Sequence, residues 1–186
     1  MSRIGRLPIQ VPNGVTVDVT VDNIVVVTGP KGSLRQYMDP VITLTKSEEE
    51  GKSLVVLTRA NEMPAVKAKH GLYRALIADM VKGVTDGYTK SLTINGVGYK
   101  VEVKGNKIVM NIGFSHAVNV DIPEGLTATC PSQTEIVVSG ISKERVGQFA
   151  ADLKAIKPVE PYHGYGIHYT NETVRRKEIK KGAKKK

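Results

Sequence analysis

A short stretch of the sequence recurs, and this internal repeat is the feature that most limits how the chain can fold. Val11–Val17 resembles Ile122–Ala128, and the similarity continues without a gap from Val25–Gly29 to Ile136–Gly140. Six of the nineteen aligned positions are identical, and four more are conservative replacements. Similarity at a fixed spacing usually reflects a repeated supersecondary unit. The sequence therefore predicts an internal duplication that produces two similar small domains.

The first half of the chain combines β-like segments with one amphipathic helix. Apolar residues recur near helical spacing from Pro64 to Val84, Pro suits the first turn of a helix, and Gly87 supplies a stop. The expected buried stripe of this helix is Val66, Leu72, Leu76, Met80 and Val84. Runs rich in β-branched residues and bounded by turn formers predict strands at Val15–Val19, Ile24–Thr28, Val41–Thr45 and Leu54–Thr58.

The second half repeats this plan with clearer turn signals. Asn95-Gly96 and Gly105-Asn106 are dipeptides that suit tight hairpins. Ser142 is placed to cap a second helix that ends at Pro158, and its expected buried stripe is Val146, Phe149, Ala150, Leu153 and Ile156. Strands are predicted at Ser91–Ile94, Tyr99–Val103, Lys107–Ile112, Val118–Ile122 and Glu135–Val138.

These patterns predict an α+β fold. We expect two similar small domains, each an antiparallel sheet packed with one main helix, followed by a basic C-terminal extension. The expected boundaries are residues 1–82 for the first domain, 83–157 for the second and 158–186 for the extension.

The excess positive charge is concentrated at the C-terminus. The net charge is +9, and residues 157–186 contain nine Lys or Arg against three Glu. A near-neutral body with a strongly basic end is typical of a protein whose arm reaches a polyanion, and nucleic acid is the expected polyanion. The sequence has one cysteine, Cys130, and no apolar stretch typical of a signal peptide or membrane span, so we expect a protein of a reducing compartment without a membrane partner.

Within the extension, aromatic, glycine and basic residues occur together. Tyrosines offer flat faces for bases, glycines allow close backbone approach, and cations neutralise phosphates. The predicted RNA-binding residues are Lys157, Tyr162, His163, Gly164, Tyr165, Gly166, His168, Tyr169, Arg175, Arg176, Lys177, Lys180 and Lys181. Two simpler interpretations stay open: the tyrosines pack back on their own domain, and the terminal lysines only keep the chain soluble.

Other motifs do not predict catalysis, a cofactor or a metal site. Gly29-Pro30-Lys31-Gly32 lies between predicted strands, where neither a phosphate loop nor a KH-type Gly-x-x-Gly belongs, so we interpret it as a simple turn. Glu48-Glu49-Glu50 beside Gly51 is interpreted as an exposed hairpin loop. The four histidines lack metal-ligand spacing, and nucleophile motifs are missing from the sequence. The chain is therefore not expected to be an enzyme.

A family resemblance is also present in the sequence. Glu160–Tyr169, followed by Val174–Glu178, resembles the C-terminal signature of the sixth large-subunit ribosomal protein family, bacterial type. Further stretches similar to that family run in order along nearly the whole chain: Met1–Gly5, Thr28–Gly32, His70–Arg74, Gly96–Tyr99, Asn111–His116 and Ser139–Lys143. The sequence departs from the family at His163 and Tyr165, where Lys is usual, and at His168, where Arg is usual.

The resemblance implies a structural constituent of the large ribosomal subunit. It implies that the second domain and the tail bind large-subunit ribosomal RNA and stabilise its tertiary structure near the region where translation factors bind. It also implies contact with neighbouring large-subunit proteins and a part in late subunit assembly. The implied location is the ribosome of a bacterial cytoplasm. Two other functions stay open: an RNA-binding regulator outside the ribosome, and a β-rich hydrolase with an unrecognised site.

Overall fold

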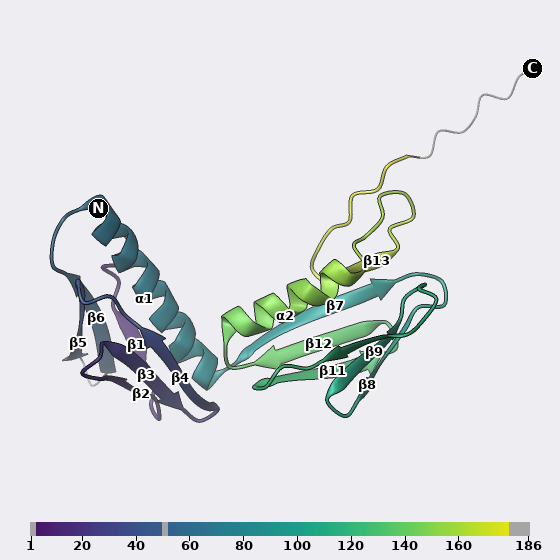
Figure 1. Cartoon of the computed structure of the whole chain (residues 1–186). Helices are drawn as coiled ribbons and strands as arrows, with labels where there is room; N and C mark the ends of the chain where they lie inside the picture. The colour runs from purple at the N-terminus through teal and green to yellow at the C-terminus, as the bar shows by residue number, and fades with distance from the viewer. Residues whose placement is uncertain (1–2, 50–51, 179–186) are drawn as a thin grey trace, which may run out of the picture. The chain divides into compact units, whose positions relative to one another are not determined.

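The computed structural model describes residues 3–49 and 52–178 (Figure 1). The chain divides into two compact units. The first runs to Tyr88 and includes Ile141–Lys143, and the second comprises Thr89–Gly140 and the chain from Glu144 onward.

The first unit contains two antiparallel sheets and a long helix. The sheets have the strand orders β1-β6-β5 and β2-β3-β4. Their elements are β1 (Ile9–Val11), β2 (Thr16–Val19), β3 (Ile24–Gly29), β4 (Gly32–Tyr37), β5 (Ile42–Glu49), β6 (Lys52–Arg59) and α1 (Pro64–Thr85). The helix packs on the strands through a core that includes Val25, Val27, Ile42, Ile77 and Val84.

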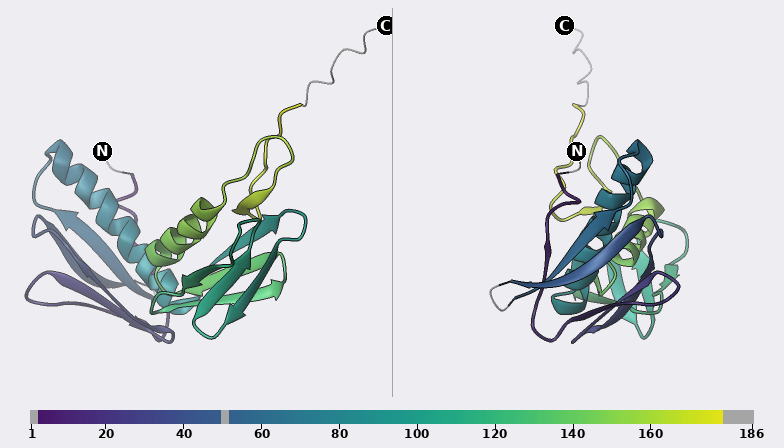
Figure 2. Two further views of the ribbon diagram at one scale, coloured as in Figure 1. Left: turned by 45° about the vertical axis from the view of Figure 1, so that its right-hand side comes forward. Right: turned by 90° about the vertical axis from the view of Figure 1, so that its left-hand side faces the viewer.

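The second unit has the same kinds of element and one additional strand. Its sheets have the orders β10-β9-β8 and β11-β12-β7-β13, and α2 lies along one face of the second sheet (Figures 1 and 2). The elements are β7 (Tyr88–Asn95), β8 (Lys100–Lys104), β9 (Lys107–Asn111), β10 (Val118–Asp121), β11 (Leu126–Ser132), β12 (Glu135–Gly140), α2 (Lys143–Ile156) and β13 (Gly166–Tyr169).

The two units share one topology, which confirms the predicted α+β fold with an internal duplication. The order β1-β6-β5 corresponds to β7-β12-β11, and β2-β3-β4 corresponds to β8-β9-β10. In each unit the helix follows the last of these strands along the chain. The additional strand β13 pairs with β7 on the edge that the equivalent strand β1 leaves unpaired within the described residues.

The sequence alignment that suggested the duplication, however, pairs strands that are not equivalent. It aligns β2 and β3 with β11 and β12, whereas their structural counterparts are β8 and β9. The same local turn explains the similarity. Val15 N donates to Pro12 O and Leu126 N donates to Pro123 O, both at 3.2 Å, with a left-handed glycine between them in each case. A Pro-x-Gly turn leading into a β-strand has the same residue requirements wherever it occurs.

Helix α1 has the predicted extent but a different buried face. Val66, Met80 and Val84 are buried as expected, whereas Leu72 is 53% exposed and the expectation for it was wrong. His70 and Ile77 complete the buried stripe instead. The helix ends at Thr85, and Gly87, at a φ of +78°, donates its N–H to Lys82 O, which is the stop that the sequence predicted.

His70 is a buried polar residue whose ring nitrogens are both satisfied. Nε2 donates to Leu57 O at 2.9 Å, and Nδ1 lies 3.2 Å from the Arg59 guanidinium. A Cβ added to Gly5 would lie 2.5 Å from His70 Nδ1. The N-terminal segment therefore closes over this histidine because Gly5 has no side chain.

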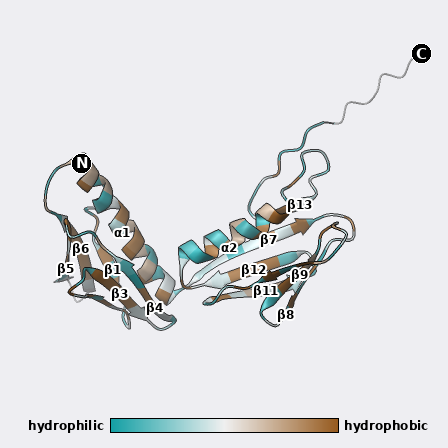
Figure 3. Ribbon diagram, viewed as in Figure 1, coloured by the Kyte–Doolittle hydropathy of each residue, from teal (hydrophilic) through white to brown (hydrophobic). Residues whose placement is uncertain are grey.

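Helix α2 buries the face that the sequence predicted. Val146, Phe149, Ala150 and Leu153 are all at most 5% exposed, while Ile156 is half-buried. Burying a large apolar side chain contributes about 1.5–3 kcal/mol. Along α2, hydrophilic and hydrophobic segments alternate, as expected for a helix with one buried face (Figure 3). This face packs α2 firmly on the second unit.

The turn predictions have mixed outcomes. Gly105-Asn106 forms a two-residue hairpin between β8 and β9, and Pro30-Lys31 forms the simple turn between β3 and β4. Asn95-Gly96 does not form a hairpin, because β7 and β8 belong to different sheets. Glu48 and Glu49 belong to β5 rather than to a loop, and Glu50 and Gly51 lie outside the described residues.

Candidate nucleic-acid interface

The chain beyond α2 forms a folded arm, defined here as residues 157–178. Glu160 N donates to Tyr165 O at 2.9 Å, and Ile167 N donates to Lys157 O at 2.8 Å. Strand β13 then pairs antiparallel with β7, placing Gly166 opposite Asn95 and Tyr169 opposite Leu92. The first part of the arm is thus fixed to the second unit by backbone hydrogen bonds, and the chain leaves it towards the C-terminus (Figure 1).

Two glycines make this path possible. Gly166 has a φ of +141°, and a Cβ there would lie 2.7 Å from Pro158 O and from Val159 Cα. Gly164 has a φ of +76°, and a Cβ there would lie 2.8 Å from Arg176 Nε. Both glycines are buried. Their missing side chains allow the arm to pack on itself.

Glu160 holds the turn at residues 161–163. Its Oε1 accepts hydrogen bonds from the backbone N–H of His163 and, at 3.0 Å, from His163 Nδ1. The backbone N–H of His163 is the main reason that the pKa of the Glu160 carboxyl lies below its ordinary value. The carboxylate therefore fixes the position of the His163 ring.

The rings of the arm face different environments. His163 stacks on Tyr165, with ring centroids 5.3 Å apart and an interplanar angle of 16°. Tyr162 is 49% exposed and His163 is also exposed, whereas Tyr165 and His168 are half-buried. His168 Nδ1 lies 2.9 Å from Tyr169 O. Exposed aromatic surface suited to a partner is therefore concentrated at Tyr162 and His163.

Tyr169, by contrast, packs on its own domain. Lys154 Nζ lies 4.9 Å and Lys90 Nζ 5.6 Å from the centre of its ring. Lys154 also pairs with Glu172 at 2.6 Å, and this hydrogen bond is the main reason that the pKa of the Glu172 carboxyl is lowered. This cluster clamps the end of β13 to α2 and β7.

Beyond this clamp the arm presents unpaired cations. Arg175, Arg176 and Lys177 are exposed, and no carboxylate of residues 3–49 or 52–178 lies within ion-pair distance of their side chains. The backbone N–H of Lys177 donates to Pro161 O at 2.7 Å, which returns the chain to the turn that carries Tyr162. The predicted residues Lys180 and Lys181 lie outside the described residues.

The structure also brings to the arm a residue that the sequence interpretation missed. Lys157 Nζ lies 4.8 Å from the centre of the Phe114 ring, and Phe114 is 45% exposed. Residues so far apart in the sequence leave no local pattern from which this contact could be predicted. The signal in the sequence that could have indicated Phe114 was an aromatic residue directly after a glycine, in a segment without a strand pattern.

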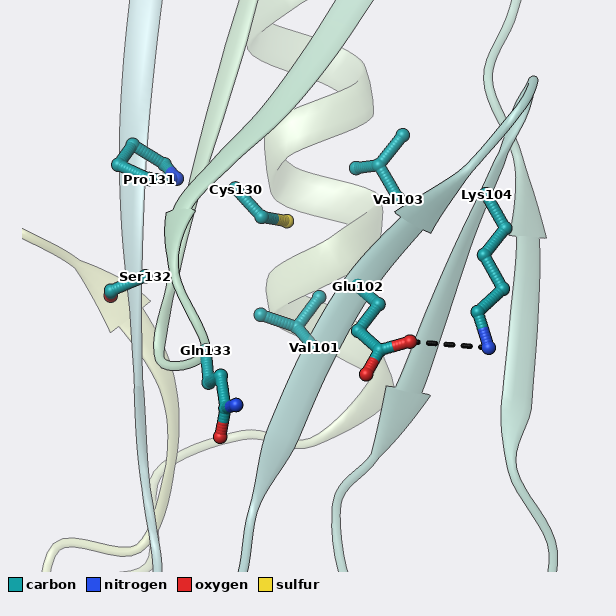
Figure 4. A pocket seen from close by; sticks show the side chains of 8 residues that line it. All are labelled: Val101, Glu102, Val103, Lys104, Cys130, Pro131, Ser132 and Gln133. Carbon is teal, nitrogen blue, oxygen red and sulfur yellow. Dashed lines mark ion pairs between the residues drawn. The ribbon is translucent and has the colours of Figure 1, made fainter.

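A shallow hollow in the second unit offers no catalytic chemistry. It lies between β8 and the β11–β12 turn, where the Cys130 side chain points towards the strand that carries Val101 and Val103 (Figure 4). Burial raises the pKa of the Cys130 thiol, which disfavours the reactive thiolate. Glu102, also at the hollow, pairs with Lys104 at 3.1 Å.

The described residues contain no group of three or more His, Cys, Asp or Glu side chains placed to hold a metal ion. None of the helices in the described part of the chain is both long and apolar enough to cross a membrane. Stacking rings beside unpaired cations are the most distinctive chemistry of the molecule, and this combination suits irregular RNA.

Comparison with known proteins agrees with this fold. The family described as "Ribosomal protein L6" matches twice, at residues 11–87 and 95–170. The second match begins in β7 and the first at the end of β1, which is the strand equivalence that the two topologies show.

Full-length relatives are also found. A protein of Clostridium botulinum named "Large ribosomal subunit protein uL6" is 49% identical over 184 residues, 99% of this chain and 100% of the relative. Proteins with the same name from Dictyoglomus thermophilum and Latilactobacillus sakei are 46% identical over 184 residues and 47% identical over 182 residues, covering 99% and 98% of this chain and 100% and 99% of the relatives.

The family model matches both halves of the duplicated fold, and the sequence is similar to these relatives along nearly its full length. Together these findings define the class as that of a ribosomal protein. The chain belongs to the ribosomal protein L6 family.

Proposed function

We propose that this protein is a structural constituent of the large ribosomal subunit that binds ribosomal RNA through its arm and acts in translation. The observation that carries the proposal is the group of three exposed cations without acidic partners among the described residues, beside an exposed tyrosine, on a chain fixed to the fold by β13. The names of the relatives, which are large-subunit proteins, support the same role.

The predicted RNA-binding residues divide into two groups by their surroundings. The exposed side chains of Tyr162, His163, Arg175, Arg176 and Lys177 contact RNA directly. The half-buried or buried residues shape the surface behind them and contact RNA through their remaining exposed atoms and backbone; these are Lys157, Gly164, Tyr165, Gly166, His168 and Tyr169. Lys180 and Lys181 extend the cationic segment in sequence.

The proposed contacts differ in what they supply. Arg and Lys neutralise phosphates and position the protein on RNA, whereas an aromatic ring stacks on an unpaired base. His163 presents a ring where lysine is usual, and its Nδ1 lies 3.0 Å from Glu160 Oε1, which orients that ring. Stacking of His163 on Tyr165 takes the place of the contacts that the lysines usual at these positions would make.

The finer parts of the proposal concern organisation and location. Functionally we divide the chain into residues 1–82, 83–157 and 158–186, with the last segment as the RNA-binding extension. We place the protein in the cytoplasmic ribosome beside neighbouring large-subunit proteins, close to where translation factors bind, with no catalytic role and no cofactor.

Salt dependence of binding tests the proposal. Removing one cation that neutralises a phosphate reduces the slope of log K against log salt by about 0.7–0.9. Replacing Arg175, Arg176 and Lys177 by Gln is therefore expected to lower the slope by about 2–3 for binding to large-subunit particles stripped of this protein. Arg35→Gln in β4 is the matched control, because Arg35 is an exposed cation of the first unit. An unchanged slope for the triple variant would contradict the proposal.

A further inference from the structure

Two turns of the second unit, residues 96–99 after β7 and residues 113–116 after β9, rest on one aromatic ring. A Cβ on Gly96 would lie 2.3 Å from Tyr99 Cδ2, and one on Gly113 would lie 2.9 Å from the Tyr99 hydroxyl oxygen. Gly98 and Gly113 have φ angles of +75° and +78°. The Tyr99 ring therefore joins the two turns into one fixed surface next to the end of β7.

These turns expose apolar side chains at their tips. Val97 is 85% exposed and Phe114 is 45% exposed, whereas the other phenylalanine of the chain, Phe149, is 5% exposed in the core. A rigid turn that presents an aromatic ring to solvent gains nothing for the stability of its own fold. Where exposed apolar side chains adjoin one another and are bordered by polar groups, they mark an interaction site.

The turns adjoin the arm through two contacts. Lys157 Nζ lies over the Phe114 ring at 4.8 Å. Asn95, the residue before Gly96, donates from Nδ2 to Gly164 O at 3.2 Å. Residues 95–101 and 111–120 contain no Asp or Glu. The two turns that adjoin the arm thus contribute no acidic residue of their own.

We infer that residues 96–98 and 113–116 form a second part of the RNA-binding surface, in which Phe114 stacks on an unpaired base and Lys157 neutralises the adjacent phosphate. This inference rests on the proposed function and extends it to residues outside the arm. RNA fits better than a protein partner, because turns that present an aromatic face beside a cation and contribute no carboxylate combine stacking with phosphate neutralisation. Tyr99 acts as a positioning residue, since Gly96 and Gly113 both pack directly against its ring.

The test measures binding of the full-length protein to large-subunit particles from which the native copy has been removed. Loss of base stacking costs about 1–3 kcal/mol, so Phe114→Ala is expected to weaken binding by about 5- to 150-fold. Phe114→Tyr keeps the ring and is expected to bind within about threefold of wild type. Because stacking releases no counterions, the salt slope should be the same for Phe114→Ala and wild type.

Controls separate this inference from the proposed function. Val21→Ser alters a fully exposed apolar residue in the β2–β3 turn of the first unit, and its binding should match wild type. Thermal unfolding verifies that Phe114→Ala remains folded. Normal binding by Phe114→Ala while the arm variants are impaired would overturn the inference alone, whereas normal binding by the arm variants would contradict the proposed function.

Crosslinking provides a second readout. Ultraviolet irradiation of ribosomes, followed by mass spectrometry, is expected to give RNA adducts on the peptide that contains Phe114. Crosslinks from that peptide to a neighbouring protein without RNA adducts would show that the turn is a protein contact and would overturn the inference.

Discussion

Replacing Gly166 by Ala should release the arm from the second unit. The backbone φ of +141° is strongly disfavoured for any residue with a side chain, and the new Cβ would lie 2.7 Å from backbone atoms of Pro158 and Val159. Backbone strain of this kind costs about 1–3 kcal/mol, and insertion of a methyl group into a packed site costs about 1–3 kcal/mol more. The expected total is about 2–6 kcal/mol, a large fraction of the stability of a small domain.

Hydrogen exchange at the Ile167 amide measures this cost directly. The amide donates to Lys157 O at 2.8 Å and lies in β13. Since 1.4 kcal/mol corresponds to a factor of ten, its protection should fall by about 30- to 20,000-fold in Gly166→Ala.

Gly147→Ala in α2 is the matched control. A Cβ at Gly147 would meet no atom within 4 Å, and Ala in place of Gly inside a helix stabilises by about 0.5–1 kcal/mol. The protection of Ile167 should therefore be equal or higher in this variant. If Gly166→Ala left the protection within a factor of two of wild type, the close packing described for the arm would be refuted.

Three further results are expected. Ile77→Ala should lower the free energy of unfolding in urea by about 2–5 kcal/mol and Leu72→Ala by less than about 0.5 kcal/mol, because Ile77 is 1% and Leu72 is 53% exposed; equal losses would contradict the buried face assigned to α1. Glu172→Gln should destabilise by less than about 1 kcal/mol at pH 7, because the pair with Lys154 is partly exposed. The lowered pKa of Glu172 means that its contribution is present above pH 4.5 and is lost as pH falls through the folded value, so wild type and variant should converge in acid; a difference that persists there would exclude the ion pair as its cause. Tyr88 should titrate near pH 12, because burial is the main cause that raises its pKa to about 12; if an absorbance titration of Tyr88→Phe still contained a tyrosine ionisation near pH 12, the raised pKa would not belong to Tyr88.

Local sequence patterns predicted the elements whose requirements are local. Both helices were found because apolar residues recur at helical spacing, and the Gly105-Asn106 hairpin was found because few residues suit its turn. The prediction that Leu72 is buried was wrong, because the buried face of α1 contains His70 and Ile77 instead. A buried histidine with both ring nitrogens hydrogen-bonded has no distinctive signature in a sequence.

Elements defined by distant partners could not be found in this way. Strand β13 contains three residues of the predicted site, Gly166, His168 and Tyr169, yet its pairing with β7 depends on residues far apart in the chain. The polar strand β4 and the strand β11, which contains Pro131, also lack a clear β signal. Short β1 was missed for the same reason.

The predicted site residues from Lys157 to Lys177 lie together in one arm, but the sequence did not separate their roles. Gly166 and Tyr169 meet the packing needs of the chain itself, whereas Tyr162 and Arg175 are exposed. A residue type indicates which interactions are chemically possible. Only the path of the backbone decides which of those interactions are made within the chain.

The most direct test of the central claim is ultraviolet crosslinking of intact ribosomes, with mass spectrometry of every peptide of this protein. We expect adducts of large-subunit RNA on peptides from residues 157–178, above all on those with Tyr162 and Arg175–Lys177. Adducts on other peptides together with none in the arm would contradict the account, because the arm would then pack internally and the RNA-binding surface would lie elsewhere.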